Sequence, residues 1–566
     1  MAQLDCVILG FYDYPFRGYV DLLRGMGTGS GSYQDLSLAF IELDGEPMRA
    51  LDVFTRFYHD GRPGPHKLFH NADFLWPVVA YLTSYLGRRG LDVDYVNLPH
   101  LEGERLAALL EDGVRSVAIT TTLYVSPHPI LAMVENVRRL DPDVPIIIGG
   151  PYIANQKQLL DHASLTALFE YLGCDIYVLC QEGEATLARL LEAIRTGEPL
   201  QRVPNLAFRG GDGRFTFTMP QPEANELGEN IIDYKPFVGT SLGEFLSVRT
   251  SKSCPFACAF CGFPERAGAY KYLDVSGVER LLNAVADTGA VTTLTFLDDT
   301  FNVPKGRFKE LLRMMIRNRY GFRWNCLYRA DHGDDEAIDL MAESQCEGVF
   351  LGVESGSDQM LQRMNKSARR KHYLHAIPRL NSCGISTYAS LIIGFPGETN
   401  ETIRDTIELV EEAAPEYYRT QLWYADPVTP IWQQRQAYGI TGEGFNWSHA
   451  TMSVGEACDR INSTFLDVKN AEWLPQFGFE QWSVFYLSRL GMTRPQIRRF
   501  VGCFNAIIKH ALASGGAAAP PELVDDLRAS CQFDRDRSAT AATNVHAAPI
   551  PWSGDLAGAS GSITRR

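Results

Sequence analysis

The chain has 566 residues, of which 45% are hydrophobic and 21% charged, as in a globular protein with several domains. The net charge of −15 argues against nucleic acid as a partner, and no run approaches the ~18 apolar residues of a membrane span, so we expect neither kind of partner. The N-terminus lacks a basic segment before its short apolar run, and the twelve cysteines are scattered apart from one triplet. We therefore expect a cytoplasmic protein with reduced thiols.

Residues 1–205 alternate short apolar runs with amphipathic segments, a pattern that predicts a mainly parallel, doubly wound α/β domain. The expected strands are 6–10, 93–98, 117–122, 146–148 and 175–179. Ligands of such sheets bind at the carboxyl ends of the strands. The candidate ligand-binding residues at these ends are Thr121, Thr122, Ser126, Gly149, Gly150, Glu182 and Gly183. Glycines allow close backbone approach and hydroxyls can hydrogen-bond, although ordinary α/β loops carry the same residues, and Ser126 is also a potential helix N-cap.

The stretch 27–72 is rich in Gly, Asp and aromatic residues, and 58–71 reads as a long loop. Its His66 and His70 could approach a metal or a substrate. Histidines in loops are more commonly hydrogen-bonded structural residues, so both interpretations stay open.

Residues 206–242 are expected to be a connector, with a small hairpin formed by 203–208 and 214–218. The segment 243–435 then alternates strand and helix six times, which predicts a partial parallel (β/α)6 barrel. The strands are expected near 245–250, 291–297, 322–328, 348–353, 386–393 and 417–423, and the helices at 274–288, 305–319, 334–345, 369–382 and 399–413.

Cys254, Cys258 and Cys261 follow the first of these strands at C-x3-C-x2-C spacing. Thiolates are soft ligands that suit iron–sulfur clusters. Three cysteines on a [4Fe–4S] cluster would leave one iron open for a substrate or cofactor. The alternatives are three unpaired core cysteines, or a zinc site with a remote fourth ligand.

Polar residues or glycines follow the other five strands, at the end of the barrel where active sites lie. The candidates are Asp298 and Asp299, Arg329, Glu354, and Ile393 with Gly394. Taken singly, the aspartates could be turn residues, Arg329 a structural ion-pair partner, and Glu398 a residue favoured by a helix dipole.

The remaining chain divides in two. Residues 436–515 are expected to form a helical, aromatic domain on the substrate side of the molecule, with most of its tryptophans in the core. The tail 516–566 is rich in Ala, Gly, Pro and Ser, which predicts disorder.

The cysteine spacing and the order of the later motifs resemble the radical S-adenosylmethionine (SAM) superfamily. The resemblance implies a [4Fe–4S] cluster whose open iron binds the amino and carboxylate groups of SAM. Asp298 and Asp299 would then meet the amino group, where Gly-Gly-Glu is commoner. Glu354 would make ribose or methionine contacts, and the backbone of Ile393 and Gly394 would hold the adenine.

Residues 1–205, with the Gly-Gly-Pro and Glu-Gly-Glu turns, resemble the domain that binds cobalamin in class B members of that superfamily. Many cobalamin proteins carry D-x-H-x-x-G after the first strand, and its histidine ligates cobalt from below. Here 13–18 reads Asp-Tyr-Pro-Phe-Arg-Gly, with Pro15 at the histidine position. The resemblance therefore implies bound cobalamin without a histidine ligand from this loop; water or another side chain remains open.

The whole chain, including 124–129 and 473–475, looks most similar to the P-methyltransferases of phosphinothricin-peptide biosynthesis and, less closely, to the tryptophan 2-C-methyltransferase of thiostrepton biosynthesis. This implies methyl transfer from SAM, by way of methylcobalamin, to a phosphorus or carbon centre of a small-molecule or peptide precursor in antibiotic biosynthesis. The electron donor would be a flavodoxin or ferredoxin. The alternatives are a rearrangement or cyclisation on the same cofactors without methylation, and a non-catalytic cobalamin or Fe–S sensor.

Overall fold

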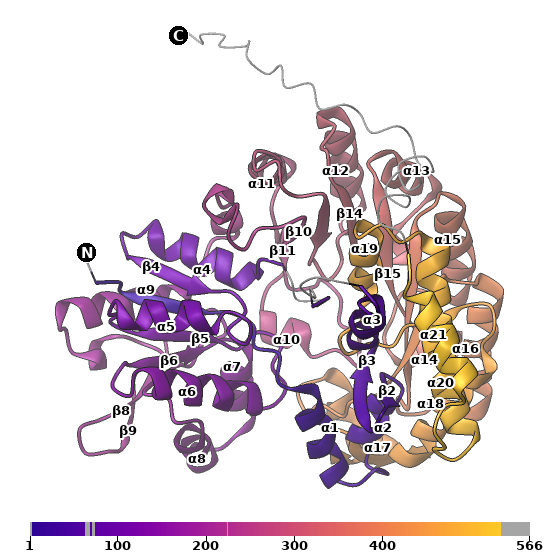
Figure 1. Ribbon diagram of the computed structural model, residues 1–566, viewed down its shortest axis with the longest axis horizontal. Helices are drawn as coiled ribbons and strands as arrows, with labels where there is room; N and C mark the ends of the chain where they lie inside the picture. Colours follow the sequence, from indigo (N-terminus) through magenta and orange to yellow (C-terminus); the bar gives the residue numbers. More distant parts are fainter. Residues whose placement is uncertain (1–2, 63–67, 71–73, 224, 534–566) are drawn as a thin grey trace.

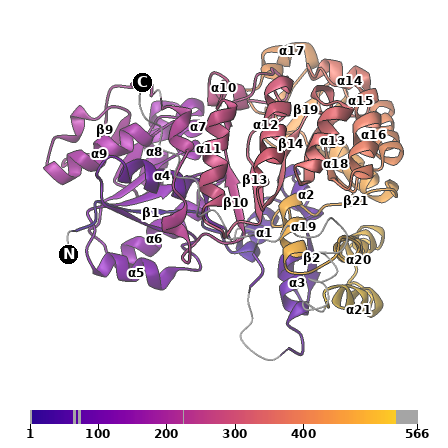
Figure 2. The same ribbon diagram turned by 90° about the horizontal axis from the view of Figure 1, so that it is seen from above.

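The computed structural model describes residues 3–62, 68–70, 74–223 and 225–533. It consists of two α/β bodies side by side, each built on a seven-stranded sheet (Figures 1 and 2). This arrangement confirms the expected α/β fold of a Rossmann-like sheet followed by a partial parallel barrel. None of the described helices is long and apolar enough to cross a membrane.

The first sheet has the order β4-β1-β5-β6-β7-β8-β9. Its parallel strands are β1 (Cys6–Leu9), β4 (Val93–Val96), β5 (Val117–Thr120), β6 (Ile146–Gly149) and β7 (Ile176–Val178), the five expected from the sequence. Helices α4 (Pro77–Gly87) and α9 (Glu184–Thr196) cover one face. The other face is covered by α5 (Gly103–Glu111), α6 (His128–Leu140), α7 (Pro151–Leu159) and α8 (His162–Leu172). Because helices cover both faces, the sheet is doubly wound, and its strands bury apolar side chains on both sides.

The expected hairpin is present as β8 (Leu206–Arg209) and β9 (Phe215–Phe217). It pairs antiparallel to β7 and so extends the first sheet. The stretch that the sequence indicated as a connector therefore begins inside this sheet.

The second sheet is parallel throughout, in the order β10-β13-β14-β15-β16-β17-β21. Six strands match the prediction: β10 (Phe245–Val248), β13 (Thr293–Phe296), β14 (Arg323–Tyr328), β15 (Cys346–Glu354), β16 (Ser386–Ile393) and β17 (Tyr417–Leu422). The seventh, β21 (Glu472–Trp473), was not anticipated, because two residues carry no readable periodicity. The surrounding helices are α11 (Val275–Ala286), α12 (Lys305–Asn318), α13 (Asp335–Glu343), α14 (Asp358–Arg363), α15 (Arg370–Ser382) and α16 (Asn400–Ala413).

Short elements connect this frame near the cysteine loop and beyond β17. They are β11 (Ser251–Lys252), β12 (Lys271–Tyr272), α10 (Phe263–Ala267) and α17 (Arg435–Tyr438).

An arm leaves the first sheet after β1 and lies against the second body (indigo in Figure 1). It comprises α1 (Phe16–Gly25), α2 (Gly31–Ser37), β2 (Phe40–Leu43), β3 (Glu46–Arg49) and α3 (Ala50–Tyr58). The backbone N–H of Leu422 at the end of β17 donates to the Asp35 carboxylate at 3.3 Å, and Arg419 donates to the Asp35 carbonyl at 3.1 Å. This crossing of the arm was not predicted from the residue pattern.

The C-terminal region corrects two expectations. Residues 436–515 are not only helical: β18 (Thr441–Glu443), β19 (Asn446–His449) and β20 (Met452–Ser453) precede α18 (Val454–Asp467), α19 (Gln481–Arg489) and α20 (Arg494–Ala513). Part of the expected disordered tail is ordered, because α21 (Pro521–Ser530) packs on α20 and α3 and buries Leu527. Residues 534–566 lie outside the described part of the chain.

Candidate functional site

The three cysteines lie on the loop that follows β10 and β11, at the carboxyl end of the second sheet. Cys258 is buried, whereas Cys254 and Cys261 are partly exposed. The three thiols influence one another electrostatically, and burial raises the pKa of Cys261 to about 11. The backbone N–H of Phe263 donates to the Cys261 sulfur at 3.5 Å, a contact that would stabilise a thiolate there.

The three cysteines come from one short loop, and thiolates are the usual ligands of iron–sulfur clusters. They would supply three of the four protein or cofactor contacts of a [4Fe–4S] cluster.

Asp298 organises the chain that leads into this loop. Its carboxylate is fully buried and accepts hydrogen bonds from the backbone N–H of Thr250 at 2.6 Å and of Ser251 at 2.8 Å, and from the Thr250 hydroxyl. Arg307 donates to the same hydroxyl at 2.9 Å. The Asp298 carboxylate is thus turned into the protein, and its partners give it a positioning role.

Asp299 is the aspartate with a carboxylate near the thiols, and it contributes to the electrostatics of Cys254 and Cys261. Burial, together with the negative charge of Asp298, raises its pKa to about 7. A positively charged group placed beside it would restore its charge.

Arg329 lies against one aromatic residue of the cysteine loop, and Glu354 pairs with a lysine that lies near another. Arg329 pairs with Asp331 at 2.9 Å, and its guanidinium lies 3.7 Å from the centre of the Phe256 ring. Glu354, a non-glycine residue with φ of 66°, accepts from Lys366 at 3.0 Å, and the Lys366 ammonium lies 6.0 Å from the Phe260 ring. Phe256 and Phe260 alternate with the cysteines, so both pairs support the loop.

The backbone at Ile393 and Gly394 is largely engaged within the protein. The Ile393 carbonyl accepts from the backbone of Trp423 at 2.9 Å. The Gly394 N–H donates to Glu398 at 2.6 Å, and its carbonyl contacts His449 Nε2 at 2.9 Å. These contacts give Ile393 and Gly394 a structural role that the sequence did not indicate. The position of His449 in the sequence did not predict its contact with this turn.

Gly394 could not be another residue without rearrangement. Its φ is +95°, and a Cβ atom there would lie 2.6 Å from the Trp447 ring. Trp447 stacks on His449, with ring centres 5.2 Å apart, and together they cover the turn after β16.

The carboxyl edge of the first sheet brings together several of the predicted residues. The Thr121 hydroxyl donates to the Gly149 carbonyl at 2.9 Å, and a Cβ at Gly150 would lie 2.9 Å from that hydroxyl. Thr121 therefore joins the ends of β5 and β6. Beyond the half-buried Thr122, Leu123 and Val125 are 66% and 85% exposed, which leaves apolar surface at the ligand-binding edge.

Ser126 does not cap α6. The helix begins at His128, and the Ser126 hydroxyl contacts the His128 ring at 3.4 Å, so the expected N-cap position was wrong by one residue. In the turn between β7 and α9, the Glu182 carboxylate forms an ion pair with Lys252 of β11, two residues before Cys254. Gly183 is the N-cap of α9, and a Cβ there would lie 2.8 Å from Val178.

A polar cluster lies at the end of β1. Asp13 pairs with Arg49 at 3.0 Å and with His70 Nε2 at 2.9 Å, and its backbone N–H donates to His100 Nδ1 at 3.2 Å. Burial alone would raise the pKa of Asp13, but the hydrogen bond from His70 and the charge of Arg49 hold it at about 2. Pro15 is the N-cap of α1.

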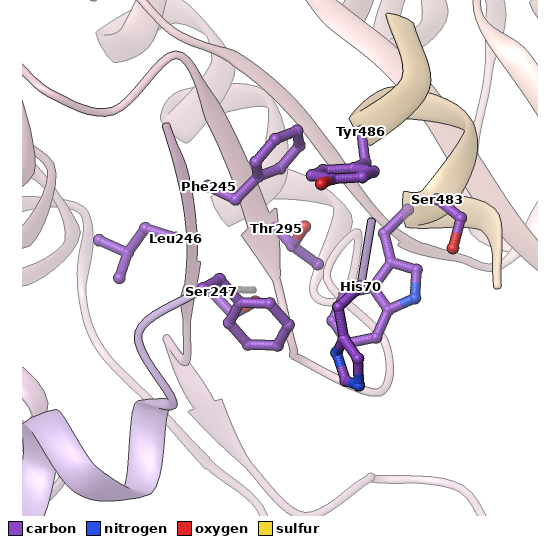
Figure 3. A pocket seen from close by; sticks show the side chains of 9 residues that line it. His70, Phe245, Leu246, Ser247, Thr295, Ser483 and Tyr486 are labelled. Carbon is purple, nitrogen blue, oxygen red and sulfur yellow. The ribbon is translucent and has the colours of Figure 1, made fainter. Parts of the chain in front are cut away.

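His70 also lines a small apolar pocket in the second body, with Trp482, Ser483 and Tyr486 of α19 (Figure 3). His66 lies outside the described residues. Asp13, His70 and His100 have ligand atoms within 4.8 Å of one another. The adjacent Arg49 guanidinium and the donor to His100 Nδ1 make the cluster unfavourable for a cation.

Residues 248–410 match the model of the radical SAM superfamily. An uncharacterised methyltransferase of Pyrococcus horikoshii is 22% identical over 367 residues, which are 63% of this chain and 77% of that protein. An anaerobic magnesium-protoporphyrin IX monomethyl ester cyclase of Rubrivivax gelatinosus is 22% identical over 453 residues, 74% of this chain and 77% of that protein.

Among solved structures, the radical SAM methyltransferase TsrM of Kitasatospora setae, with tryptophan and a SAM analogue bound, superposes with a TM-score of 0.52. The sequences are 20% identical, and the superposition covers 66% of this chain and 75% of that one. The likeness shows a shared fold. The domain that matches the superfamily model, residues 248–410, contains all three cysteines, as expected for a radical SAM enzyme that uses a [4Fe–4S] cluster and SAM.

Proposed function

We propose that this enzyme is a cobalamin-dependent methyltransferase, acting in the cytoplasm on a phosphorus or carbon centre of a natural-product precursor in antibiotic biosynthesis. The observation that carries the proposal is the ion pair between Lys252 and Glu182, because it joins the cysteine loop directly to the carboxyl edge of the first sheet. Two cofactor sites, one on each body, would then face a common space.

On the second body, Cys254, Cys258 and Cys261 would hold the cluster. Asp299 is suited to the SAM amino group, because a cation beside this half-buried carboxyl would stabilise its charged form. Glu354 is placed at the carboxyl end of β15 for a ribose or methionine contact, and Lys366 compensates its charge. The Gly394 N–H and carbonyl are already hydrogen-bonded within the protein, so an adenine at this turn would pack against Gly394 without using these two groups.

On the first body, Thr122, Leu123, Val125 and Gly150 line the edge proposed for cobalamin. The exposed apolar side chains suit the flank of a corrin ring, and the glycine suits close approach of its periphery. Pro15 offers no ligand to cobalt. When bound, the cluster would supply the electron that cleaves SAM, and cobalamin would carry the methyl group.

The names of two relatives support different reactions. The Pyrococcus protein is called a methyltransferase, and the methyltransferase TsrM shares the fold. The Rubrivivax relative is called a cyclase. Its name supports the second candidate function for this chain, a reaction without methyl transfer.

The two candidates differ in their products. The reconstituted enzyme, reduced by flavodoxin or ferredoxin, is incubated with SAM bearing a ¹³CH₃ group and with candidate phosphinates and indoles. Methyl transfer predicts a labelled product together with S-adenosylhomocysteine. A rearranged, unlabelled product would instead favour the second candidate, and failure to cleave SAM would favour a sensor.

A further inference from the structure

We propose that the turn Glu182-Gly183-Glu184 is a positioning element that holds the cluster loop at a fixed separation from the first sheet. The expected effect on methyl transfer rests on the proposed two-cofactor function, whereas the contact itself needs no cofactor.

The turn brings two carboxylates from the first body toward two cations from the second. Glu182 pairs with Lys252, and the two side chains are 19% and 21% exposed. Arg249 lies within electrostatic reach of both Glu184 and Asp299. Glu182 and Glu184 come from the first body, and Lys252 and Arg249 come from the second. Their opposite charges therefore favour one relative placement of the two sheets.

The basic side of this contact is rigid. Between Arg249 and Lys252, the backbone of Thr250 and Ser251 is fixed by the buried Asp298 carboxylate, and Arg307 holds the Thr250 hydroxyl. Lys252 also belongs to β11, which pairs with β12. Lys252 therefore lies on a fixed segment that Asp298 links to the end of β13.

The acidic side is rigid as well. Gly183 begins α9, and a Cβ at this position would lie 2.8 Å from Val178 in β7, so the turn lies directly on the sheet. Glu223 accepts from the backbone of Ala185 at 2.9 Å and of Thr186 at 2.7 Å in the same helical turn. The ion pair thus connects two segments that are each held by several hydrogen bonds, one on each body.

The consequence for the proposed reaction is a coupling of two steps. SAM cleavage needs only the second body, whereas use of the cleaved SAM for methyl transfer needs both bodies at the correct separation. A misplacement of about 1 Å can lower a rate by as much as about 100-fold. Loss of the ion pair should therefore spare cleavage and lower the product formed per SAM cleaved.

The test measures the separation directly in the full chain. Ketone-bearing residues are introduced at the exposed positions 171 in α8 and 280 in α11 and are spin-labelled. Pulsed electron paramagnetic resonance then reports the distance between the two bodies. Glu182→Gln and Lys252→Gln should each broaden the distance distribution, and the exchange Glu182→Lys with Lys252→Glu should narrow it again. The matched control is Lys235→Gln, which removes the more exposed ion pair of Lys235 with Asp287.

The same variants are then loaded with cluster and cobalamin. We expect unchanged iron content and SAM cleavage, and about 10- to 100-fold less product per SAM cleaved, restored by the exchange. Unchanged distances in both single variants would overturn the inference. So would lost cobalamin affinity that the exchange does not restore, because Glu182 would then contact the cofactor. A wild-type protein that binds no cobalamin would refute the proposed function, while the distances still decide the positioning role.

Discussion

The two aspartates after β13 differ in what their carboxylates contact. Asp298 accepts three hydrogen bonds from Thr250 and Ser251, whereas Asp299 lies within electrostatic reach of the cysteine thiols. The two aspartates thus have different roles. Asp298 holds the backbone before the cysteine loop, and Asp299 lies beside the proposed SAM site.

Substitution should separate these parts. Asp298→Ala leaves two buried N–H groups without acceptors, so we expect a loss of about 3 kcal/mol in the free energy of unfolding and a lower iron content. Asp299→Asn should keep both and weaken SAM binding about tenfold, as measured by calorimetry. Equal effects of the two substitutions on unfolding would contradict this division.

The cysteine loop can be tested by metal content. Changing Cys254, Cys258 or Cys261 to Ala removes a cluster ligand, and each variant should lose most of its iron and its cluster absorbance. Cys503→Ala, at a partly exposed cysteine on α20, is the matched control and should keep both. A full iron–sulfur spectrum in any of the three variants would refute the ligand assignment.

Glu398 should make stability depend on pH. Burial raises its pKa from 4.5 to about 8, so the stability that the protonated form contributes is complete below about pH 4.5 and is lost as the pH rises through about 8. Glu398→Gln should remove this loss, worth up to about 1.4 kcal/mol per unit of pKa difference.

The measurement is the unfolding free energy of wild type and variant from pH 5 to 9. The difference should grow in favour of Glu398→Gln as the pH rises, while Glu401→Gln, on the exposed first turn of α16, should leave the wild-type profile unchanged. Parallel profiles for wild type and Glu398→Gln would show that Glu398 is ionised throughout.

At the scale of elements, the arm from α1 to α3 connects the first chain segment to the second body. Its Gly31 lies against the backbone of Phe445, where a Cβ atom would come within 2.3 Å of the carbonyl oxygen. A backbone atom cannot give way as a flexible side chain can, so this contact fixes the position of α2 within the arm.

Gly31→Ala should therefore destabilise the protein by about 1–3 kcal/mol through overpacking, seen as a lower thermal midpoint. Gly29→Ala is the control, because nothing lies within 4 Å of a Cβ there. If both substitutions had the same small effect, the arm would not be held against Phe445 as described.

The sequence predicted the elements that repeat and missed those that depend on distant contacts. All eleven strands of the two parallel sheets expected from apolar runs are present, because burial on both faces leaves a clear composition. The arm, β21 and α21 were missed. Their positions depend on contacts such as Asp35 with Leu422 and Leu527 with its core, which local periodicity does not encode.

The site followed the same rule. The cysteine spacing predicted its ligand set from three residues alone, and the strand ends predicted where the other polar side chains gather. The partners could not be predicted: Glu182 with Lys252, Gly394 with His449, and Asp13 with His70 each join residues at least 55 positions apart.

At the scale of the whole molecule, the Glu182–Lys252 ion pair joins the carboxyl edge of the first sheet to the cysteine loop of the second. The domain that matches the radical SAM model carries the three cysteines, and the first sheet has an edge with exposed apolar side chains. We propose that methyl groups pass from SAM to a cobalamin bound at this edge.

That claim is tested without knowing the acceptor. The reconstituted enzyme is incubated anaerobically with cobalamin, reductant and SAM bearing a CD₃ group, and the cobalamin recovered from the protein is analysed by mass spectrometry. We expect a CD₃ group on the recovered cobalamin and an equal amount of S-adenosylhomocysteine. Unlabelled cobalamin from a protein that binds both cofactors and cleaves SAM would contradict it.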